Sequence, residues 1–268
     1  MPELPEVEYA AQIARAAAVG LTIAGVRVLH RAQRRALSPH VTRTLTGDVV
    51  AAVVRRGKYQ LISLASGRTL LVHFKLNGDW VAATWDALPR HARVALDFSG
   101  GTSLVLVDSR ALASITLHLA GEVLLAHLGP EANSKAFSAD WLALMFRQRR
   151  GPVKVALLDQ RMVAGLGNIY ACEALWYAHI DPRTPAKALG GEALRALVRG
   201  AKRAISKALE HPERYYLPGG VSDAVRFNVY DREGRPCRRC GASLRRLVQT
   251  GRSTYYCDGC QTPRGARS

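Results

Sequence analysis

The sequence predicts an α+β protein of several domains: a β-rich N-terminal domain led by one helix, a helical domain, and a C-terminal zinc ribbon with four cysteine ligands. Three observations support this prediction. Short alternating or β-branched runs fill residues 21–119, apolar residues recur every three or four positions in residues 138–210, and two Cys-x2-Cys pairs lie near the C-terminus. A length of 268 residues is consistent with about two ordinary domains.

A helix is predicted at the N-terminus. Pro5 lies near its start, where proline is favoured, apolar residues form one broad face, and Gly20 ends it. The runs that follow include TIAGVRVL, YQLISL, TLLVHF, RVALDF and SLVLV, separated by Gly, Asp and Ser. Their even spacing predicts a β-sandwich or a flattened barrel, within a first domain of residues 1–130.

The periodicity becomes helical after HLGPEA (residues 127–132). Helices are predicted in SADWLALMFRQ, VKVALLDQ, NIYACEALWYA and GGEALRALVRGAKRAISKALE, which form a second domain over residues 131–226. Residues 211–226 contain two Pro and two Gly without periodicity, and we interpret them as a mobile functional loop. Asn168 is interpreted as an N-cap, and the helix start behind the glycines of GLGN would favour an anion.

Residues 227–268 are predicted to fold around one metal ion. Cys237-x2-Cys240 and Cys257-x2-Cys260 are sixteen residues apart, the spacing of a four-thiolate zinc site. Four protein ligands leave no open position for a substrate, so this Zn2+ would be structural. The fifth cysteine, Cys172, is interpreted as a small buried apolar side chain.

The charge balance predicts a polyanionic partner. Thirty-eight Lys and Arg face twenty-one Asp and Glu, a formal charge of +17, and such an excess disfavours a compact chain unless an anion offsets it. No apolar run approaches the ~20 residues that span a bilayer, and the N-terminus lacks the pattern of a secretory signal. Clustered cysteines that bind metal favour a reducing, cytoplasmic location.

The N-terminus could supply a reactive amine. Met1 precedes a small residue, so its removal is expected to leave the secondary amine of Pro2 beside Glu3. An α-amino group has a pKa near ~8, against ~10.4 for lysine, and the positive end of a helix opposes its protonation further. A secondary amine that attacks an aldehyde-like carbon gives an iminium, which accepts electrons during elimination, and Glu3 could move protons. Taken alone, such letters usually mark an ordinary helix start.

Six motifs occur together in order: PELPEVE (2–8), RRGKY (55–59), HLGPEA (127–132), AGLGNIYACEAL (164–175), VYDREGRPCRRCG (229–241) and GRSTYYCDGCQ (251–261). In this combination the chain resembles the formamidopyrimidine-DNA glycosylase and endonuclease VIII family. The resemblance implies a β-sandwich, a helix-two-turn-helix domain and a zinc ribbon that hold damaged double-stranded DNA between them. It also implies base-excision repair by a bifunctional DNA glycosylase and abasic-site lyase, which removes oxidised bases through a Schiff base and cuts the strand by β,δ-elimination. We expect a monomer without a nucleotide cofactor.

The resemblance also implies residue roles. Pro2 would be the nucleophile, Glu3 the acid that assists base release, and Lys58 a lysine that contacts phosphate and assists elimination. Arg252 would grip the phosphates that flank the lesion. The remaining DNA contacts would be Leu76, His91, Arg110, Arg149, Lys154 and Asn168, and the four paired cysteines would hold the zinc ion.

One segment departs from the family pattern. The family's Asp-Pro-Arg-Arg-Phe run is replaced by residues 108–112, DSRAL, and Leu76 replaces a methionine. Leu76 can still wedge into a base stack, but Ala111 can make no bidentate contact with a base. We therefore expect weak discrimination among the bases opposite a lesion. Residues 211–226 also lack the Gly-Gly-Thr-Thr-type lesion cap of the 8-oxoguanine enzymes, so the substrate stays open between oxidised purines, formamidopyrimidines, oxidised pyrimidines and abasic sites.

Two alternatives remain. A protein on this scaffold could bind damaged DNA or abasic sites without turnover, although the retention of Pro2, Glu3 and Lys58 argues against this. A metal-dependent nuclease would need clustered carboxylates for catalytic ions, and the sequence shows no such cluster.

Overall fold

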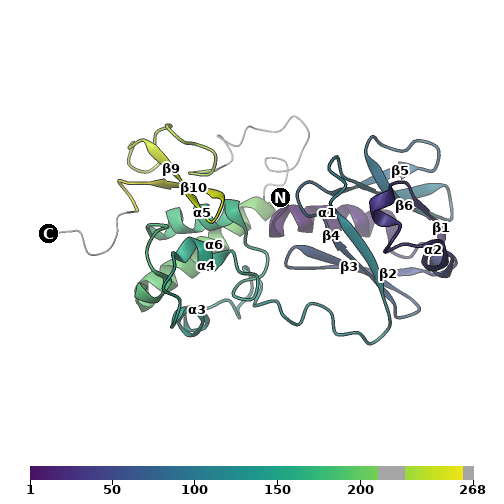
Figure 1. Cartoon of the computed structure of the whole chain (residues 1–268), viewed down its shortest axis with the longest axis horizontal. Coiled ribbons are helices and arrows are strands. Elements are labelled where there is room, and N and C mark those ends of the chain that lie inside the picture. The colour runs from purple at the N-terminus through teal and green to yellow at the C-terminus, as the bar shows by residue number, and fades with distance from the viewer. Residues whose placement is uncertain (211–226, 262–268) are drawn as a thin grey trace. The chain divides into compact units, whose positions relative to one another are not determined.

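The computed structural model describes residues 1–210 and 227–261, so the loop predicted at residues 211–226 lies outside the described residues. The chain divides into two compact units, Met1–Ala126 and His127–Ser268 (Figure 1). Each unit has its own secondary structure.

The first unit is a β-sandwich with a leading helix. Its sheets are antiparallel and four-stranded, with the orders β1-β6-β7-β5 and β2-β3-β4-β8. The elements are α1 (Leu4–Ala18), β1 (Ile23–Val28), β2 (Val50–Arg56), β3 (Tyr59–Leu64), β4 (Thr69–His73), β5 (Asp79–Thr84), β6 (Ala92–Phe98), β7 (Thr102–Val107) and β8 (Ser114–His118). The sandwich alternative of the sequence analysis is confirmed.

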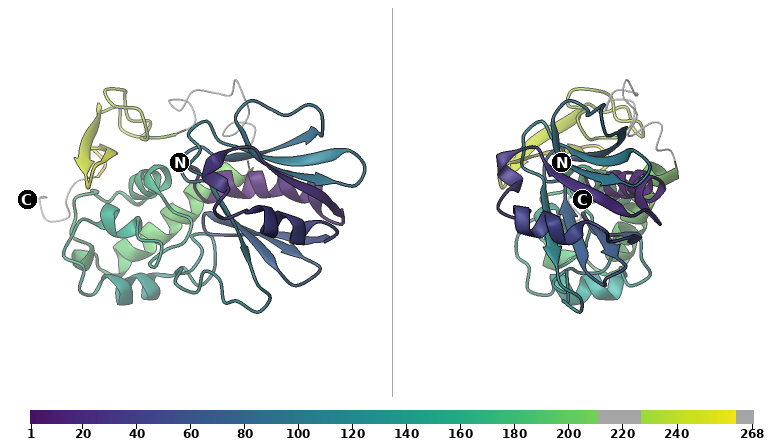
Figure 2. Two further views of the ribbon diagram at one scale, coloured as in Figure 1. Left: turned by 45° about the vertical axis from the view of Figure 1, so that its right-hand side comes forward. Right: turned by 90° about the vertical axis from the view of Figure 1, so that its right-hand side faces the viewer.

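Helix α1 completes the core of this sandwich. Its alanine-rich face packs with buried residues of both sheets in one apolar cluster, and Figure 2 shows the helix running alongside the sheets. Buried Gln60 on β3 fixes the helix further: its Nε2 donates to the Val7 carbonyl at 2.9 Å, and its Oε1 accepts from Trp80 Nε1 at 2.6 Å. A glutamine with both ends satisfied can be buried without a large penalty, so it holds α1, β3 and β5 in one frame.

One helix in this unit was missed. The alternating runs predict strands throughout residues 21–119, but α2 (Pro39–Leu45) and a 3-10 turn (Arg31–Gln33) interrupt them. Ser38 caps α2 by accepting a hydrogen bond from the Val41 amide at 3.4 Å, and Pro39 occupies the first turn. This Ser-Pro start is a recognisable helix signal, although it leads into only seven residues of weak periodicity.

In its described residues, the second unit joins four α-helices and a short 3-10 helix (Ala186–Ala188) to a two-stranded hairpin. The α-helices are α3 (Ala139–Phe146), α4 (Val153–Leu157), α5 (Asn168–Ala178) and α6 (Gly191–Glu210). The strands of the hairpin are β9 (Leu244–Gln249) and β10 (Arg252–Cys257). Each predicted helical stretch contains one helix, although α4 ends at Leu157 rather than continuing through Gln160. Helices α5 and α6 approach closely at Gly200, where a Cβ atom would lie 2.5 Å from the Ala174 carbonyl oxygen. The predicted mixture of sheets, helices and a cysteine cluster is confirmed.

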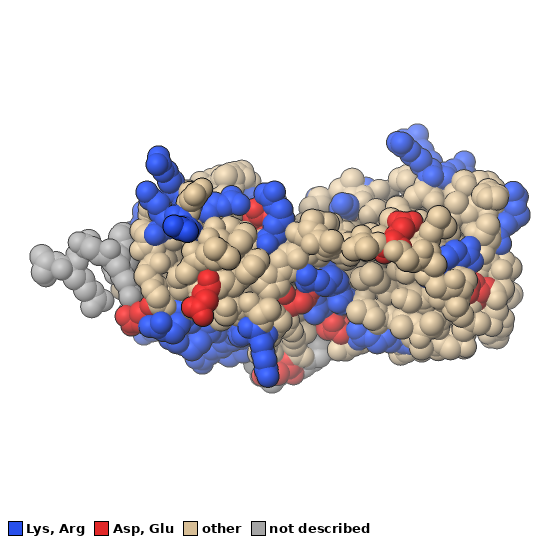
Figure 3. Space-filling model, turned by 90° about the horizontal axis from the view of Figure 1, so that it is seen from below, with Lys and Arg blue, Asp and Glu red and all other residues tan. Residues whose placement is uncertain are grey.

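Basic side chains are spread over the surfaces of both units. Figure 3 shows Lys and Arg on each unit, with acidic side chains between them. Within the described residues, no helix has the length and apolar character needed to cross a membrane.

Candidate DNA-binding and catalytic residues

The N-terminal residues lie at the start of α1. Glu3 is the N-cap and is buried, with 1% of its surface exposed. Glu6 and Glu3 form a reciprocal capping box, in which Glu6 Oε2 accepts from the Glu3 amide at 2.8 Å. Pro2 is partly exposed, and its nitrogen becomes a secondary amine only when Met1 is removed. Glu3, which follows the predicted nucleophile in the chain, is thus a buried carboxylate at the start of α1.

Lys58 lies in the tight turn between β2 and β3. Gly57 precedes it with φ of +59°, which suits the first central position of a two-residue hairpin turn. The Lys58 side chain is 5% exposed. Arg55 donates to Glu8 Oε2 at 2.8 Å and to the Gly57 carbonyl at 3.2 Å. Together with the Gln60 contact to α1, these bonds tie the Lys58 hairpin to the first two turns of α1.

His73 lies near this lysine, opposite Tyr59 in the sheet, at a position outside the six sequence motifs. Its ring packs edge-on against Tyr59 at 4.5 Å between centroids, and its Nδ1 accepts from the Lys75 amide at 2.9 Å. Burial, together with the positive charges of Lys75 and Lys58, lowers the pKa of His73 to about 4. The histidine is therefore neutral at pH 7, and it adds no further charge beside Lys58.

The low pKa of His73 predicts a pH effect on stability. Between about pH 4 and 6.5, His73 is protonated in the unfolded chain, where its pKa is near 6.5, but is neutral in the folded protein. The free energy of unfolding therefore falls as pH drops from about 6.5 to about 4. Replacing His73 by Asn should flatten this part of the curve. Urea midpoints of both proteins between pH 4 and 8 test the prediction, and parallel curves over that window would contradict it.

Two loops of the first unit present Leu76 and Leu112 to solvent. These side chains are 40% and 49% exposed. Asn77 in one loop donates a hydrogen bond to Ser109 Oγ in the other, so the loops are adjacent. An exposed apolar pair on neighbouring loops is suited to insertion between bases.

Asp108 organises the second of these loops. The carboxylate is buried and accepts from the amides of Arg110, Leu112 and Ala113 at 2.9, 2.6 and 2.7 Å. Its backbone amide donates to the carbonyl of His91 at 3.0 Å. The structure therefore gathers Leu76, His91 and Arg110 around one set of loops, as their shared predicted role requires.

Loss of the Asp108 carboxylate should destabilise this unit. An Asp108→Ala variant leaves the amides of Leu112 and Ala113 without their acceptor, and we expect a loss of about 3 kcal/mol in the free energy of unfolding. Asp86→Ala, which removes an exposed carboxylate, serves as the control. Equal denaturation midpoints for the two variants would contradict the prediction.

Asn168 corrects one prediction from the sequence. Gly167 is the N-cap of α5, and Asn168 is the first helical residue. The Asn168 side chain does not cap its helix because it bonds elsewhere: its Oδ1 accepts from Lys154 Nζ at 2.5 Å, and its Nδ2 donates to the Ser253 carbonyl at 2.9 Å. Lys154, Asn168 and the residue after Arg252 are thereby brought together.

Arg149 lies in a separate ion-pair group. Asp159 accepts from Arg149 at 3.2 Å and from Arg161 at 3.0 Å. The hydrogen bond from Arg161 outweighs burial and lowers the pKa of Asp159. The Arg161 side chain is 69% exposed. One carboxylate oriented between two guanidinium groups leaves a net positive charge for a phosphate.

The four paired cysteines form a metal site. Their sulfur atoms lie within 4.8 Å of one another, and within the described residues this is the one group of three or more His, Cys, Asp or Glu side chains suited to a metal ion. Gly259 gives the site room, because a Cβ there would lie 3.1 Å from Cys240 Sγ. Burial would raise the pKa of Cys237, but hydrogen bonds from Trp176 and backbone amides outweigh it and lower the pKa to about 6. The donor set fits a thiolate-bound zinc ion.

Family models match all three parts of the chain. They are described as the formamidopyrimidine-DNA glycosylase N-terminal domain (residues 1–115), the formamidopyrimidine-DNA glycosylase H2TH domain (128–215), and the zinc finger found in FPG and IleRS (234–263). Formamidopyrimidine-DNA glycosylases from Paracoccus denitrificans and Chloroflexus aurantiacus are 39% and 37% identical to the chain. The matches cover 97% of this chain and 100% and 98% of those proteins. The chain belongs to the formamidopyrimidine-DNA glycosylase family.

Solved structures of formamidopyrimidine-DNA glycosylases share the fold. The wild-type Lactococcus lactis enzyme in complex with DNA containing an oxidised pyrimidine gives a TM-score of 0.89 at 28% identity, covering 98% of this chain and 100% of that one. The Thermus thermophilus protein gives 0.83 at 34% identity, covering 97% and 98%. A further Lactococcus lactis complex, with abasic DNA, gives 0.87 at 28% identity, covering 97% and 100%. The resemblance inferred from the sequence is confirmed, as is one structural zinc ion.

Proposed function

We propose that this glycosylase-family chain removes oxidised bases from double-stranded DNA and also cuts the resulting abasic strand. The observation that most supports this is the burial of Glu3, the residue after Pro2 in the chain, in the same unit as the Lys58 hairpin. Relatives with the same fold bind DNA that contains a formamidopyrimidine, an oxidised pyrimidine or an abasic site. The proposed reaction therefore acts on the same kind of damaged DNA that these relatives bind.

The proposed reaction begins when the damaged nucleotide is flipped out of the stack. The Pro2 nitrogen attacks C1′, the bond from C1′ to the base breaks, and the base leaves with the bonding electrons. Sugar-ring opening then gives an iminium between Pro2 and C1′, with Glu3 supplying or accepting the protons. Loss of a C2′ proton expels the 3′ phosphate in β-elimination, and a second elimination expels the 5′ phosphate.

The charged residues have separate proposed tasks. Lys58 contacts a phosphate and assists elimination, and Asn168 and Arg252 bind phosphates. Arg149 contacts DNA, and Lys154 lies near the flipped nucleotide. His91 and Arg110 contact DNA beside the loop that carries Leu76. The Leu76 side chain fills the space that the flipped base leaves. Phosphate contacts position the duplex without reading its sequence. The zinc ion takes no part in this reaction, because four protein ligands leave it no open position for a substrate.

The test is a single-turnover assay on duplexes with one lesion each, opposite all four bases, in EDTA. We expect release of the free base and a one-nucleotide gap in the strand, with a phosphate on each of the two ends that border the gap. Binding without either product would favour the damage-recognition alternative. Strand cutting that requires added Mg2+, in protein shown to retain its zinc ion, would favour a nuclease.

The same assay tests opposite-base selectivity. A bidentate base contact gives about five- to 150-fold selectivity, and Ala111 can make none. For any one lesion, we expect rates across the four opposite bases to differ by less than about fivefold. A strong preference for cytosine would contradict the inference from Ala111 and direct attention to Lys75, Asn77 and Arg110.

A further inference from the structure

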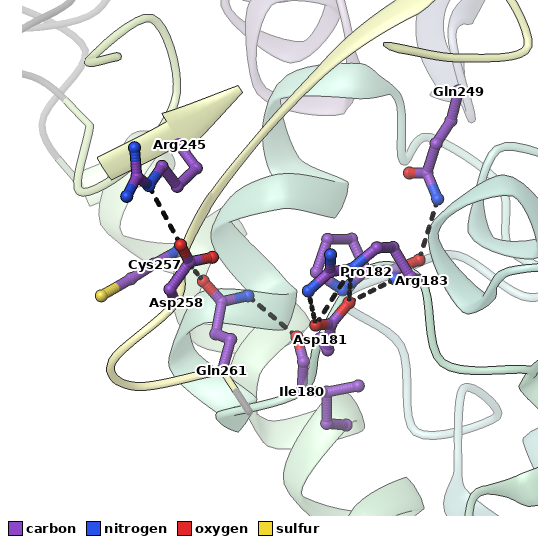
Figure 4. Close-up of polar contacts among 9 residues, drawn as sticks. All are labelled: Ile180, Asp181, Pro182, Arg183, Arg245, Gln249, Cys257, Asp258 and Gln261. Atoms are coloured by element: carbon purple, nitrogen blue, oxygen red, sulfur yellow. Dashed lines mark hydrogen bonds and ion pairs between the residues drawn. The ribbon is translucent and has the colours of Figure 1, made fainter. Parts of the chain in front are cut away.

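The zinc ribbon is fastened to residues 180–183, the segment that follows α5 (Figure 4). At the base of the ribbon, buried Gln261 donates through Nε2 to the Ile180 carbonyl at 2.8 Å and accepts from the Cys257 amide at 2.8 Å. Arg183, held by Asp181 at 2.6 Å, lies over the ring of Tyr256 at 5.1 Å. These contacts fix the end of the hairpin next to the metal site.

A second glutamine fastens the other end of the hairpin. Gln249 closes β9, is 9% exposed, and donates through Nε2 to the Pro182 carbonyl at 3.2 Å. Its Oε1 accepts from the hydroxyl of fully buried Thr254 at 3.0 Å. Both ends of this amide are therefore engaged, one with the helical part of the unit and one with the opposite strand.

The position of Arg252 depends on this end of the hairpin. Arg252 pairs with Gln249 across the strands, and only Thr250 and Gly251, with φ of +47° and +73°, separate them along the chain. The Arg252 side chain is exposed, and no hydrogen bond or ion pair to the rest of the described chain holds it. Its guanidinium is thus placed by the backbone, which Gln249 and the bond from Asn168 to Ser253 fix from two sides.

We propose that Gln249 is a positioning residue for Arg252, holding the hairpin tip against Pro182 so that the guanidinium meets a DNA phosphate. The inference rests on the proposed role of Arg252. Gln261 makes the same kind of contact at the opposite end of the hairpin, beside the zinc ligands and away from Arg252. The chain therefore supplies a matched control.

The test compares Gln249→Met with Gln261→Met, each alone and combined with Arg252→Ala. The probe is a duplex that contains a tetrahydrofuran abasic analogue, which the lyase reaction cannot cut. Gln249→Met should raise Kd by about three- to tenfold, the range for loss of a neutral hydrogen bond. It should leave one zinc per chain and have no further effect in the Arg252→Ala background, because residues that act through one contact are not additive.

The salt dependence of binding separates positioning from general loosening. If Gln249→Met loosens one phosphate contact, the slope of log Kd against log salt should fall by up to ~0.9, as it should in Arg252→Ala. An effect of Gln249→Met that persists undiminished in the Arg252→Ala background, or that Gln261→Met matches, would overturn the inference. Unchanged binding by Arg252→Ala alone would instead overturn the proposed role of Arg252.

Discussion

Borohydride is expected to link the protein covalently to abasic DNA through the nitrogen of Pro2. Reduction converts the iminium between Pro2 and C1′ into a stable amine, so the trapped complex survives denaturing electrophoresis. An extension before Pro2 turns this nitrogen into an amide and should abolish trapping. Peptide mapping of the trapped protein should place the DNA on the N-terminal peptide.

Two further variants define this result. Pro5→Ala changes the other proline at the start of α1 and should trap normally, because its nitrogen is an amide in every form of the chain. Glu3→Gln should slow base release by about 10²- to 10⁴-fold, the range for a general acid. Undiminished trapping by the extended protein, or DNA mapped to Lys58, would refute the assignment of Pro2.

Removal of the zinc ion should unfold the ribbon and weaken DNA binding by about 100-fold. Binding of a structural zinc ion supplies ~10–16 kcal/mol, much of it available only in the folded site. Without the ion, the hairpin that carries Arg252 and the Ser253 carbonyl bonded to Asn168 is no longer held in place. Two charge-assisted hydrogen bonds from the Arg252 guanidinium to phosphate, at about 1.5 kcal/mol each, are worth roughly this factor. Cys240→Ser and chelator-treated protein should behave alike in metal analysis and binding titrations.

Cys172→Ala provides the matched control, because this buried cysteine lies on α5 outside the four-sulfur cluster. It should retain one zinc per chain. Normal DNA affinity in a protein shown to contain no zinc would contradict the proposed role of the ribbon.

Some features of this protein follow from short stretches of sequence. The two Cys-x2-Cys pairs specify a metal site because each short turn presents two sulfurs whatever surrounds it. The alternating runs of the first unit and the three- or four-residue periodicity of the second predict their strands and helices for the same local reason. Pro5 and the capping box of Glu3 and Glu6 likewise specify the start of α1 within one helical turn.

Other features depend on residues far apart in the chain. The sequence around Asn168 is typical of an N-cap, but its side chain bonds to Ser253, 85 positions away, and to Lys154. The N-cap position of α5 belongs to Gly167. The sequence around Gln249 indicates only an ordinary strand residue. Its hydrogen bond to the Pro182 carbonyl is evident only in the folded structure. Local patterns set backbone periodicity and turn chemistry, whereas the partner of a polar side chain is decided by which groups the packed core leaves beside it. The sequence by itself therefore determined the helices, strands and metal ligands recognised here, and only the tertiary structure decided how Asn168, Asp108 and Gln249 orient the residues that meet DNA.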